Sequence, residues 1–482
     1  MARWIGLCIL IASSASAQWM QFRGPNGSGI AEGSKLPVIL DSKKGFVWKA
    51  DLPPGHSSPV ISGDRIFLTA ADGGALADST RSKVIDKGGR LLTICLNRRT
   101  GAILWKKEAP RPRVEQYQPT NSPASPSPVT DGRNVYVFFG DFGLISYDFN
   151  GTERWRLPLG PFNNTNGHGS SPVLVNDLLV LLCDQDSDSY MIAVDKASGR
   201  VRWKVERPEV TRSYSTPAVV KRPSGAVELI VPGSYTLTSY DAKTGEKLWW
   251  ITGLSWQPKS TPVVEGDIVY AHWWENGGES EQPTETPTFD EVLSRFDANH
   301  DRKLSADEVA SDQRMQRGFA DNDLGRDGFI DERDWNFYRA RRNSRNTLLA
   351  VKTGARGDLT GTKNILWSMQ KFLPNVPSPL LYRGVLYLIK DGGILTAVDA
   401  RTGEIQKQGR LTGALETYYA SPIAAGDHVY LMSQGGKMTV VKAGRSWEIV
   451  ALNDFEDEAY ATPAVAGNAI YVRTRKALYC FQ

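Results

Sequence analysis

An all-β propeller of eight four-stranded blades is the fold that the sequence predicts, and three observations point to it. A Ser or Thr followed by Pro and small apolar residues recurs at Pro59, Pro128, Pro172, Pro217, Pro262, Pro379, Pro422 and Pro463. Five of the seven intervals between these prolines span 41 to 45 residues, which is the length of one propeller blade. Several repeats also carry an Asp-x-x-Thr-Gly turn before a tryptophan, and the two chain ends hold complementary parts of one blade.

The fourth repeat, residues 215 to 249, shows the expected blade most clearly. Four short β-rich runs are separated by turn residues, as in an antiparallel sheet. In the turn from Asp241 to Gly245, the glycine supplies positive φ and the aspartate can accept hydrogen bonds from the turn's amides. A docking tryptophan follows such turns at Trp105, Trp155, Trp203, Trp249 and Trp367. We expect it to pack between neighbouring blades.

The eighth blade is predicted to combine the two chain ends. The last repeat has three β-rich runs, and its missing fourth strand matches residues 45–50, which include Trp48. Pairing the first strand with the last closes the ring and removes two exposed sheet edges. Blade six has Lys407 in the tryptophan position and blade seven has an offset Trp447, so we expect weaker junctions there.

Residues 1–17 match a cleavable secretory signal, with one basic residue, an apolar run and small residues before Gln18. A retained membrane anchor is the alternative, but the apolar run is too short to span a bilayer. The 57 Lys and Arg against 53 Asp and Glu give a formal net charge of +4, which provides no nucleic-acid footprint. We therefore expect a secreted or periplasmic monomer with no membrane span.

The repeats resemble the pyrroloquinoline-quinone-like (PQQ-like) propeller repeats of quinoprotein dehydrogenases and of the propeller lipoprotein in the outer-membrane assembly machine. The resemblance rests on the Asp-x-x-Thr-Gly…Trp motif and covers residues 45–482 apart from the inserts, while the opening from Trp19 to Gly29 is similar to many secreted members. It implies architecture rather than activity. The predicted parts are a signal peptide (1–17), an N-terminal extension (18–44), a propeller segment (45–284), an EF-hand insert (285–342) and a second propeller segment (343–482).

The insert interrupts the fifth blade, where the proline interval reaches 117 residues. Phe289, Val292 and Leu293 have helical spacing and lead into a loop with EF-hand spacing. Such a loop binds calcium through oxygens at positions 1, 3, 5, 7, 9 and 12. The predicted ligands are Asp297, Asn299, Asp301, the Lys303 carbonyl, Ser305 and Glu308. Arg302 replaces the glycine of position 6, and positive φ at an arginine costs on the order of 1 kcal/mol.

A second loop follows, with its register fixed by Gly328 and Ile330. Its predicted ligands are Asp323, Asp327, the Phe329 carbonyl, Asp331 and Asp334. Gly325 offers no side-chain ligand and Asp334 replaces the bidentate glutamate, so this site should bind calcium more weakly or share it with magnesium. The alternative is a solvated helical insert, or a decayed loop pair that keeps its shape without metal.

One residue of each blade is expected at the channel mouth, two positions before each repeated Ser or Thr. These residues are His56, Ser125, Gly169, Tyr214, Lys259, Val376, Tyr419 and Tyr460. Among them, His56, Tyr214, Lys259, Tyr419 and Tyr460 could hold a planar or anionic ligand, or they could simply pack the rim. The insert and a second insertion in blade one, residues 72–89, use the same connection type. This geometry leads to the expectation of an EF-hand pair over the mouth, facing the blade-one insertion, although a pair that only decorates the rim is the favoured alternative.

Three functions follow from these features. A non-catalytic binding or scaffolding propeller, with calcium bound and an unknown protein or polymer ligand at the mouth, is favoured. A PQQ-dependent dehydrogenase is less favoured, because the resemblance implies a vicinal disulfide in many such enzymes, whereas Cys95, Cys183 and Cys480 stand singly in apolar runs. Glycan or polymer binding is the third, in keeping with the tyrosine-rich rim. Calcium is thus the expected cofactor, PQQ the alternative, and no catalytic residue is assigned.

Overall fold

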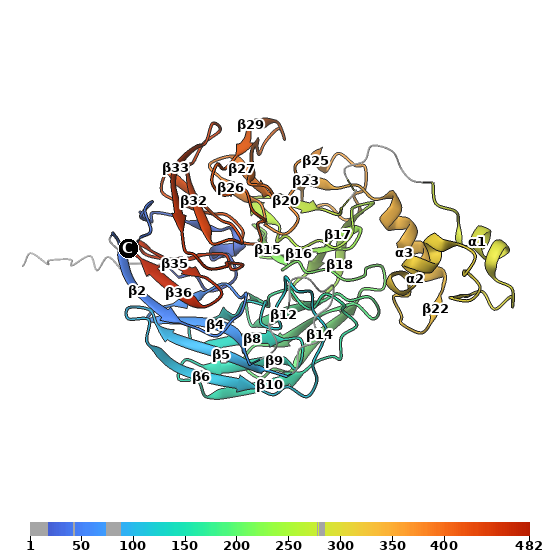
Figure 1. The fold of residues 1–482 in the computed structure, drawn as a ribbon, viewed down its shortest axis with the longest axis horizontal. Coiled ribbons are helices and arrows are strands. Elements are labelled where there is room, and N and C mark those ends of the chain that lie inside the picture. Colours follow the sequence, from blue (N-terminus) through green and yellow to red (C-terminus); the bar gives the residue numbers. More distant parts are fainter. Residues whose placement is uncertain (1–17, 42–43, 74–87, 277, 279–284) are drawn as a thin grey trace, which may run out of the picture.

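Eight small sheets are arranged radially around a central axis in the computed structural model, which describes residues 18–41, 44–73, 88–276, 278 and 285–482 (Figure 1). Each sheet contains the four antiparallel strands of one blade. The predicted eight-bladed propeller is therefore confirmed. The predicted signal peptide and most of the predicted blade-one insertion lie outside the described residues.

The first four blades follow one another along the chain from the inner strand to the outer strand. Blade one holds β3 (Val60–Ser62), β4 (Arg65–Asp72), β5 (Arg90–Asn97) and β6 (Ile103–Ala109). Blade two holds β7 (Val129–Thr130), β8 (Asn134–Phe139), β9 (Gly143–Asp148) and β10 (Glu153–Pro158). Blade three holds β11 (Val173–Val175), β12 (Leu178–Cys183), β13 (Tyr190–Asp195) and β14 (Val201–Glu206). Blade four holds β15 (Ala218–Lys221), β16 (Val227–Gly233), β17 (Thr236–Asp241) and β18 (Lys247–Thr252).

The other four blades include the strands contributed by distant parts of the chain. Blade five holds β19 (Val263–Glu265), β20 (Ile268–Trp273), β23 (Thr347–Lys352) and β25 (Ile365–Met369), and blade six holds β26 (Leu380–Tyr382), β27 (Val385–Lys390), β28 (Ile394–Asp399) and β29 (Ile405–Arg410). Blade seven holds β30 (Ile423–Ala425), β31 (His428–Met432), β32 (Lys437–Lys442) and β33 (Glu448–Asp454), and blade eight holds β34 (Ala464–Ala466), β35 (Ala469–Arg473), β36 (Ala477–Phe481) and β2 (Phe46–Asp51). Strand β2 pairs antiparallel with β36, so the two chain ends share a blade.

Tryptophans on outer strands fasten five of the junctions in the same way. Trp48, Trp105, Trp155, Trp203 and Trp367 donate from Nε1 to turn carbonyls of the next blade, at Arg98, Phe149, Lys196, Ala242 and Ala400. The turn glycine lies against the ring. At Gly199, with φ of 70°, an added Cβ would come within 2.7 Å of the Trp155 ring. The repeated glycine therefore serves both the turn and the approach of the indole.

The remaining tryptophan positions depart from this pattern. Trp249 packs with Val269 and Val351 of blade five, but its Nε1 donates to Glu228 of its own blade at 3.3 Å. A short strand, β24 (Gly357–Asp358), covers the same outer edge in parallel. At the junction of blades six and seven, Lys407 Nζ donates to the Trp447 carbonyl at 2.6 Å and lies 4.6 Å from that ring's centre. Here the indole is therefore supplied by blade seven, the later of the two blades, rather than by blade six.

The N-terminal segment crosses the propeller at the far ends of the inner strands. Trp19 bridges to Ile61 of blade one, and the amide of Thr130 in blade two donates to the Met20 carbonyl at 2.9 Å. After a single 3-10 turn, η1 (Pro25–Gly27), strand β1 (Ile30–Ala31) joins β30 of blade seven in parallel. The segment therefore spans the ring and closes one end of its axis.

The insert between β20 and β23 is a compact helical unit at the side of the ring (Figure 1). It contains α1 (Phe289–Phe296), β21 (Leu304–Ser305), α2 (Gln313–Asn322), β22 (Phe329–Ile330) and α3 (Glu332–Asn343). Its own small core includes Phe289, Leu304, Ile330 and Trp335. Within the described part of the chain, no helix has the length and apolar character needed to cross a membrane.

Candidate functional site

A pocket of about 390 Å³ occupies the axis where the links between blades meet. All eight residues that precede the repeated Ser or Thr by two positions line it: His56, Ser125, Gly169, Tyr214, Lys259, Val376, Tyr419 and Tyr460. Phe22 of the crossing N-terminal segment also lines the pocket. The structure thus gathers the sequence-predicted rim residues around one cavity, while their role in binding stays a prediction.

Three aromatic rings form one side of the pocket. His56 stacks on Tyr460 with ring centres 3.9 Å apart and an angle of 11°, and Tyr419 lies 5.2 Å from Tyr460. Burial, with the nearby charges of Arg473 and Arg475, lowers the pKa of His56 to about 3. The imidazole is therefore neutral near pH 7. This side offers flat, uncharged surfaces to a ligand.

The facing side carries the pocket's lysine. Lys259 Nζ donates to the Gln257 carbonyl at 3.2 Å and lies 5.9 Å from the centre of the Trp274 ring. Burial lowers the pKa of Lys259 to about 8. The acidic lining residue nearby, Glu275, pairs instead with Arg341 of the insert at 2.6 Å.

Amide side chains from two inter-blade links complete the wall. Asn166 Nδ2 donates to the Tyr214 hydroxyl at 2.7 Å, and its Oδ1 accepts from Gln118 Nε2 at 2.7 Å. Asn121 Nδ2 donates to the Asn166 carbonyl at 2.7 Å. Sequence reasoning missed these three amides, together with Phe22 and Trp274, because the links and the N-terminal extension carry no repeat signal that marks an inward position.

The first predicted calcium loop has a folded, hydrogen-bonded backbone. The Asp297 carboxylate accepts from the amides of Asp301 at 3.2 Å and Arg302 at 3.1 Å. Arg302 has a φ of 62°, the left-handed conformation expected at position 6. Glu308 accepts from the Ser305 amide at 2.9 Å and from the Ala298 amide at 3.1 Å. The last ligand position therefore lies against the start of the loop.

The second predicted loop repeats this pattern with shorter side chains. The Asp323 carboxylate accepts from the amides of Asp327 at 3.2 Å and Gly328 at 2.9 Å. Asp334 accepts from the amides of Leu324 at 3.3 Å and Asp331 at 3.4 Å, and it is buried. Burial, followed by the neighbouring charge of Asp331, raises the pKa of Asp334 to about 7. Both loops thus share one geometry and differ in the ligands they offer.

Strands β21 and β22 join the two loops, with Leu304 opposite Ile330 and Ser305 opposite Phe329. Among the described residues, no group of three or more His, Cys, Asp or Glu side chains converges as a metal site. The predicted ligand sets also draw on Asn and Ser oxygens and on backbone carbonyls. Their role as calcium ligands stays a prediction.

The expectation that the insert covers the channel mouth is wrong. No residue from 285 to 342 lines the described wall of the axial pocket, and the helices lie beyond the side of the ring (Figure 1). The second loop docks on blade three, where the Leu324 carbonyl accepts from Asn163 Nδ2 at 2.6 Å and Arg333 donates to the Asp186 carbonyl at 2.9 Å. The type of connection that carries the insert predicts the face of the ring from which it leaves. It does not predict whether the insert then lies over the channel or to the side of the ring.

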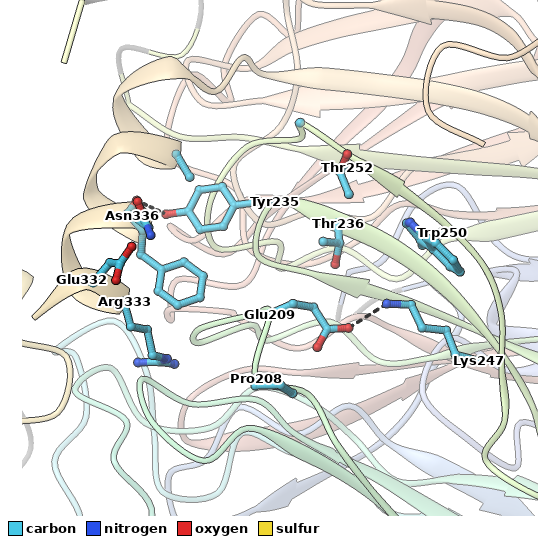
Figure 2. A pocket seen from close by; sticks show the side chains of 13 residues that line it. Pro208, Glu209, Tyr235, Thr236, Lys247, Trp250, Thr252, Glu332, Arg333 and Asn336 are labelled. Atoms are coloured by element: carbon cyan, nitrogen blue, oxygen red, sulfur yellow. Dashed lines mark hydrogen bonds and ion pairs between the residues drawn. The ribbon is translucent and has the colours of Figure 1, made fainter. Parts of the chain in front are cut away.

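A broad groove of about 770 Å³ separates α3 from blade four. Figure 2 shows Tyr235 directed toward α3, where its hydroxyl donates to the Phe337 carbonyl at 3.2 Å, and Glu209 paired with Lys247 on the side of the groove away from α3. Arg341 anchors the end of α3, with its guanidinium 3.8 Å from the centre of the Trp256 ring. The groove lies where the insert meets the ring, and none of its lining residues also lines the axial pocket.

Comparison with known proteins agrees with this architecture. A family model described as outer membrane protein assembly factor BamB matches residues 87–276 and 290–482, which is most of the chain. In a comparison with curated protein sequences, none matched significantly.

Several solved structures align with this chain at low sequence identity, and two of them, with TM-scores above 0.5, share its fold. The quinohemoprotein alcohol dehydrogenase ADHIIG from Pseudomonas putida HK5 aligns with a TM-score of 0.56 at 10% identity, over 97% of this chain and 80% of that one. The computationally designed Ika8 protein aligns with a TM-score of 0.53 at 12% identity, over 89% and 97%. BamB from Moraxella catarrhalis aligns with a TM-score of 0.49 at 12% identity, over 86% and 98%.

Proposed function

This chain belongs to the family described as outer membrane protein assembly factor BamB, and from that premise we propose that it is a non-catalytic binding propeller with a calcium-binding insert. A ligand enters the axial pocket, and the ring serves as its rigid frame. The family description names an assembly factor, which accords with a binding or scaffolding role. Fold alone does not decide function, so the proposal depends on the pocket.

The observation that carries the proposal is the form of the axial pocket. The segments that lead into the inner strands supply most of its lining, and the N-terminal segment closes its far end through Phe22. Its volume of about 390 Å³ lies within the range of small-molecule pockets, roughly 300–1,000 Å³. A blind cavity with few charged groups and many fixed polar groups suits binding of a small molecule or of one end of a polymer.

Calcium binding by the insert is supported by the first loop. It offers Asp297, Asn299, Asp301, the Lys303 carbonyl, Ser305 and Glu308, and these hard oxygen donors match the preference of Ca²⁺. The paired loops and their common backbone conformation support the same assignment. The second loop offers fewer ligands, so magnesium can compete there.

A quinoprotein dehydrogenase is the second candidate, because a quinohemoprotein alcohol dehydrogenase shares the fold over 97% of this chain. The resemblance noted above implies a quinone held with calcium by a carboxylate in the channel. In this pocket, the acidic lining residue Glu275 is already paired with Arg341. Cys95, Cys183 and Cys480 are separate buried thiols. These residues fit a metal-bound quinone poorly, and no chemical step through one is derived.

The proposed setting is outside the cytoplasm, either secreted or periplasmic. The extracellular environment is rich in calcium, so a site with a Kd on the order of 10⁻⁴ M would be filled there. We propose a monomer whose partner is a soluble protein or polymer rather than a nucleic acid.

Metal analysis and absorbance spectra of the protein purified from its native host test this proposal. The expected result is calcium bound at one equivalent or more, with no quinone absorbance and no dye-linked oxidation of alcohols or sugars. Reconstitution with PQQ and calcium is the control. Dye reduction after reconstitution would replace the binding role by a dehydrogenase role.

A further inference from the structure

A ring of hydroxyl groups forms the deep part of the axial pocket. In seven of the eight blades, the repeated Ser or Thr accepts a hydrogen bond from the amide of the equivalent residue in the preceding blade. The accepting hydroxyls, at 2.9 to 3.0 Å, are those of Ser58, Ser127, Ser171, Thr216, Ser378, Ser421 and Thr462. All seven line the pocket and are buried.

These hydroxyls have a lone pair engaged and a proton to donate. A serine or threonine hydroxyl offers one donor and two acceptor sites, and the amide of the neighbouring blade uses one acceptor. Among the described residues, no acceptor for these seven protons is found in the protein. The ring therefore presents convergent O–H donors to whatever occupies the axis, which favours a ligand rich in acceptor oxygens.

Two buried guanidinium groups stand behind this ring. Arg473 Nη1 donates to the Ser57 carbonyl at 2.8 Å, and Arg23 Nη2 donates to the Pro379 carbonyl at 2.6 Å. Both arginines are almost fully buried, and two further nitrogens of each lack a hydrogen-bond partner. No ion pair joins either to a carboxylate in the described part of the chain. Uncompensated positive charge in a low-dielectric interior attracts an anion.

Lys259 adds a third cation at the pocket wall, and Glu275, the carboxylate near it, is shared with Arg341. Burial lowers the pKa of Lys259 to about 8, so an anion lying against its amine would stabilise the charged form. The field inside the pocket is therefore positive, although the whole chain has a formal net charge of only +4. The ligand should be anionic.

The neutral side chains of the pocket indicate the chemistry of the uncharged part of the ligand. Gln118, Asn121, Asn166 and Asn276 bring amide donors and acceptors, and Tyr419 and Tyr460 bring ring faces beside hydroxyls. Amides and hydroxyls satisfy a polyhydroxylated ring, while aromatic faces pack on its C–H surface.

We propose that the axial pocket binds a carboxylated sugar, as a free hexuronate or as the terminal unit of an acidic polysaccharide. Its carboxylate lies near Lys259 and the hydroxyl ring, and its pyranose ring lies against Tyr419 and Tyr460. This inference rests on the proposed binding function and specifies the ligand class of the same pocket.

Titration calorimetry with the full chain lacking residues 1–17 tests the proposal, with sodium galacturonate, galactose and sodium acetate as probes. Galacturonate and galactose share the pyranose ring but differ in the carboxylate. We expect galacturonate to bind at least tenfold more tightly than galactose, and acetate to bind more weakly than galacturonate. Lys259→Gln should remove at least tenfold of the galacturonate affinity.

Lys247→Gln is the matched control, because Lys247 also lies over a tryptophan, 4.7 Å from the ring centre of Trp250, but outside the pocket. This variant should bind galacturonate as the parent protein does. Equal affinity for galactose and galacturonate, undiminished binding by Lys259→Gln, or no binding of galacturonate at millimolar concentration would overturn the ligand assignment. A parallel titration with PQQ distinguishes failure of the proposed binding function from failure of the proposed ligand class. PQQ binding with dye reduction would refute the binding function itself, whereas failure of the sugar acid alone would refute only its class.

Discussion

The ring and the insert are held together by different means. Ring junctions combine buried aromatic area, an indole-to-carbonyl hydrogen bond and a glycine pressed against the indole, as at Trp155 and Gly199. The insert has its own small core and meets the ring largely through polar contacts, such as the ion pair between Arg341 and Glu275. Buried apolar area contributes more to stability than half-exposed ion pairs do. The ring should therefore unfold as one closed unit, and the insert should be dispensable to it.

Deleting residues 45–52 removes the strand that closes the ring and should cause the largest loss of stability. The deletion removes β2, including the buried Trp48, and exposes the edge of β36. Loss of one buried tryptophan alone costs about 3–5 kcal/mol. We expect no cooperative thermal transition by circular dichroism. A folded protein melting within a few degrees of the parent would contradict the comparison.

Gly199→Ala tests a single tryptophan junction. An added Cβ would meet the Trp155 ring at 2.7 Å at a φ of 70°, so overpacking adds about 1–3 kcal/mol to a backbone cost of about 1 kcal/mol. Gly225→Ala is the control, because its φ is 85° with nothing within 4 Å of the added Cβ. Urea unfolding should show a clearly larger loss for Gly199→Ala. Equal losses would mean that the indole contributes little.

Glu308→Gln and Asp334→Asn compare the two loops of the insert. At calcium a hundredfold above Kd, binding adds about 2.7 kcal/mol to the stability of the native insert. Glu308→Gln should abolish most of this calcium-induced increase, and Asp334→Asn should remove less, as measured by thermal unfolding with calcium and with EGTA. Asp307→Asn, at a non-ligand position of the first loop, should change nothing. Equal losses from the first two variants would show that the loops bind metal equally.

Replacing residues 285–342 by a short Gly-Ser linker should affect the ring less than any junction variant. The insert contributes no blade strand. Its removal costs the ring an ion pair at Glu275, about 0–1 kcal/mol for a partly exposed pair. We expect a shift of a few degrees at most in the thermal transition. Loss of the folded state would show that the insert is part of the ring's cooperative unit.

The smallest effect should be that of calcium on the axial pocket. Among the described residues, the insert contacts the pocket wall from behind, through Glu275 and through Asn163 and Thr165, which precede the pocket residue Asn166. Hydrogen exchange with and without calcium should therefore change in the insert and hardly at all around Tyr214, Lys259, Tyr419 and Tyr460. Strong protection at those four residues would show that calcium binding to the insert is coupled to the pocket.

Repetition explains which parts of this arrangement could be predicted. The Ser/Thr-Pro spacing gives the blade count, and counting two residues back locates all eight inward positions that the structure places around the pocket. The same repeat carries the hydroxyl ring, whose significance appears only when neighbouring blades are in place. Local sequence also indicates helix α1, because the helical spacing of Phe289, Val292 and Leu293 lies within the insert itself.

Features that depend on contacts between distant segments could not be predicted. Phe22 reaches the pocket because the N-terminal segment pairs with blades one and seven, and no local pattern encodes that course. At the junction of blades six and seven, the tryptophan is Trp447 of the later blade, whereas at most other junctions the earlier blade supplies it. The lateral position of the insert depends on groups such as the Trp256 ring and the Asp186 carbonyl, which lie in distant parts of the chain.

The course of residues 19 to 31 also sets an order of events during synthesis. This segment is made before any blade, yet Ile30 pairs with Ala424 in a blade that is made near the end. Contacts so distant in sequence form late and slowly. The floor of the pocket therefore completes only after the seventh blade has emerged and folded, so a nascent or truncated chain would have walls without a floor. The proposed ligand should therefore bind only after the seventh blade has folded onto the N-terminal segment.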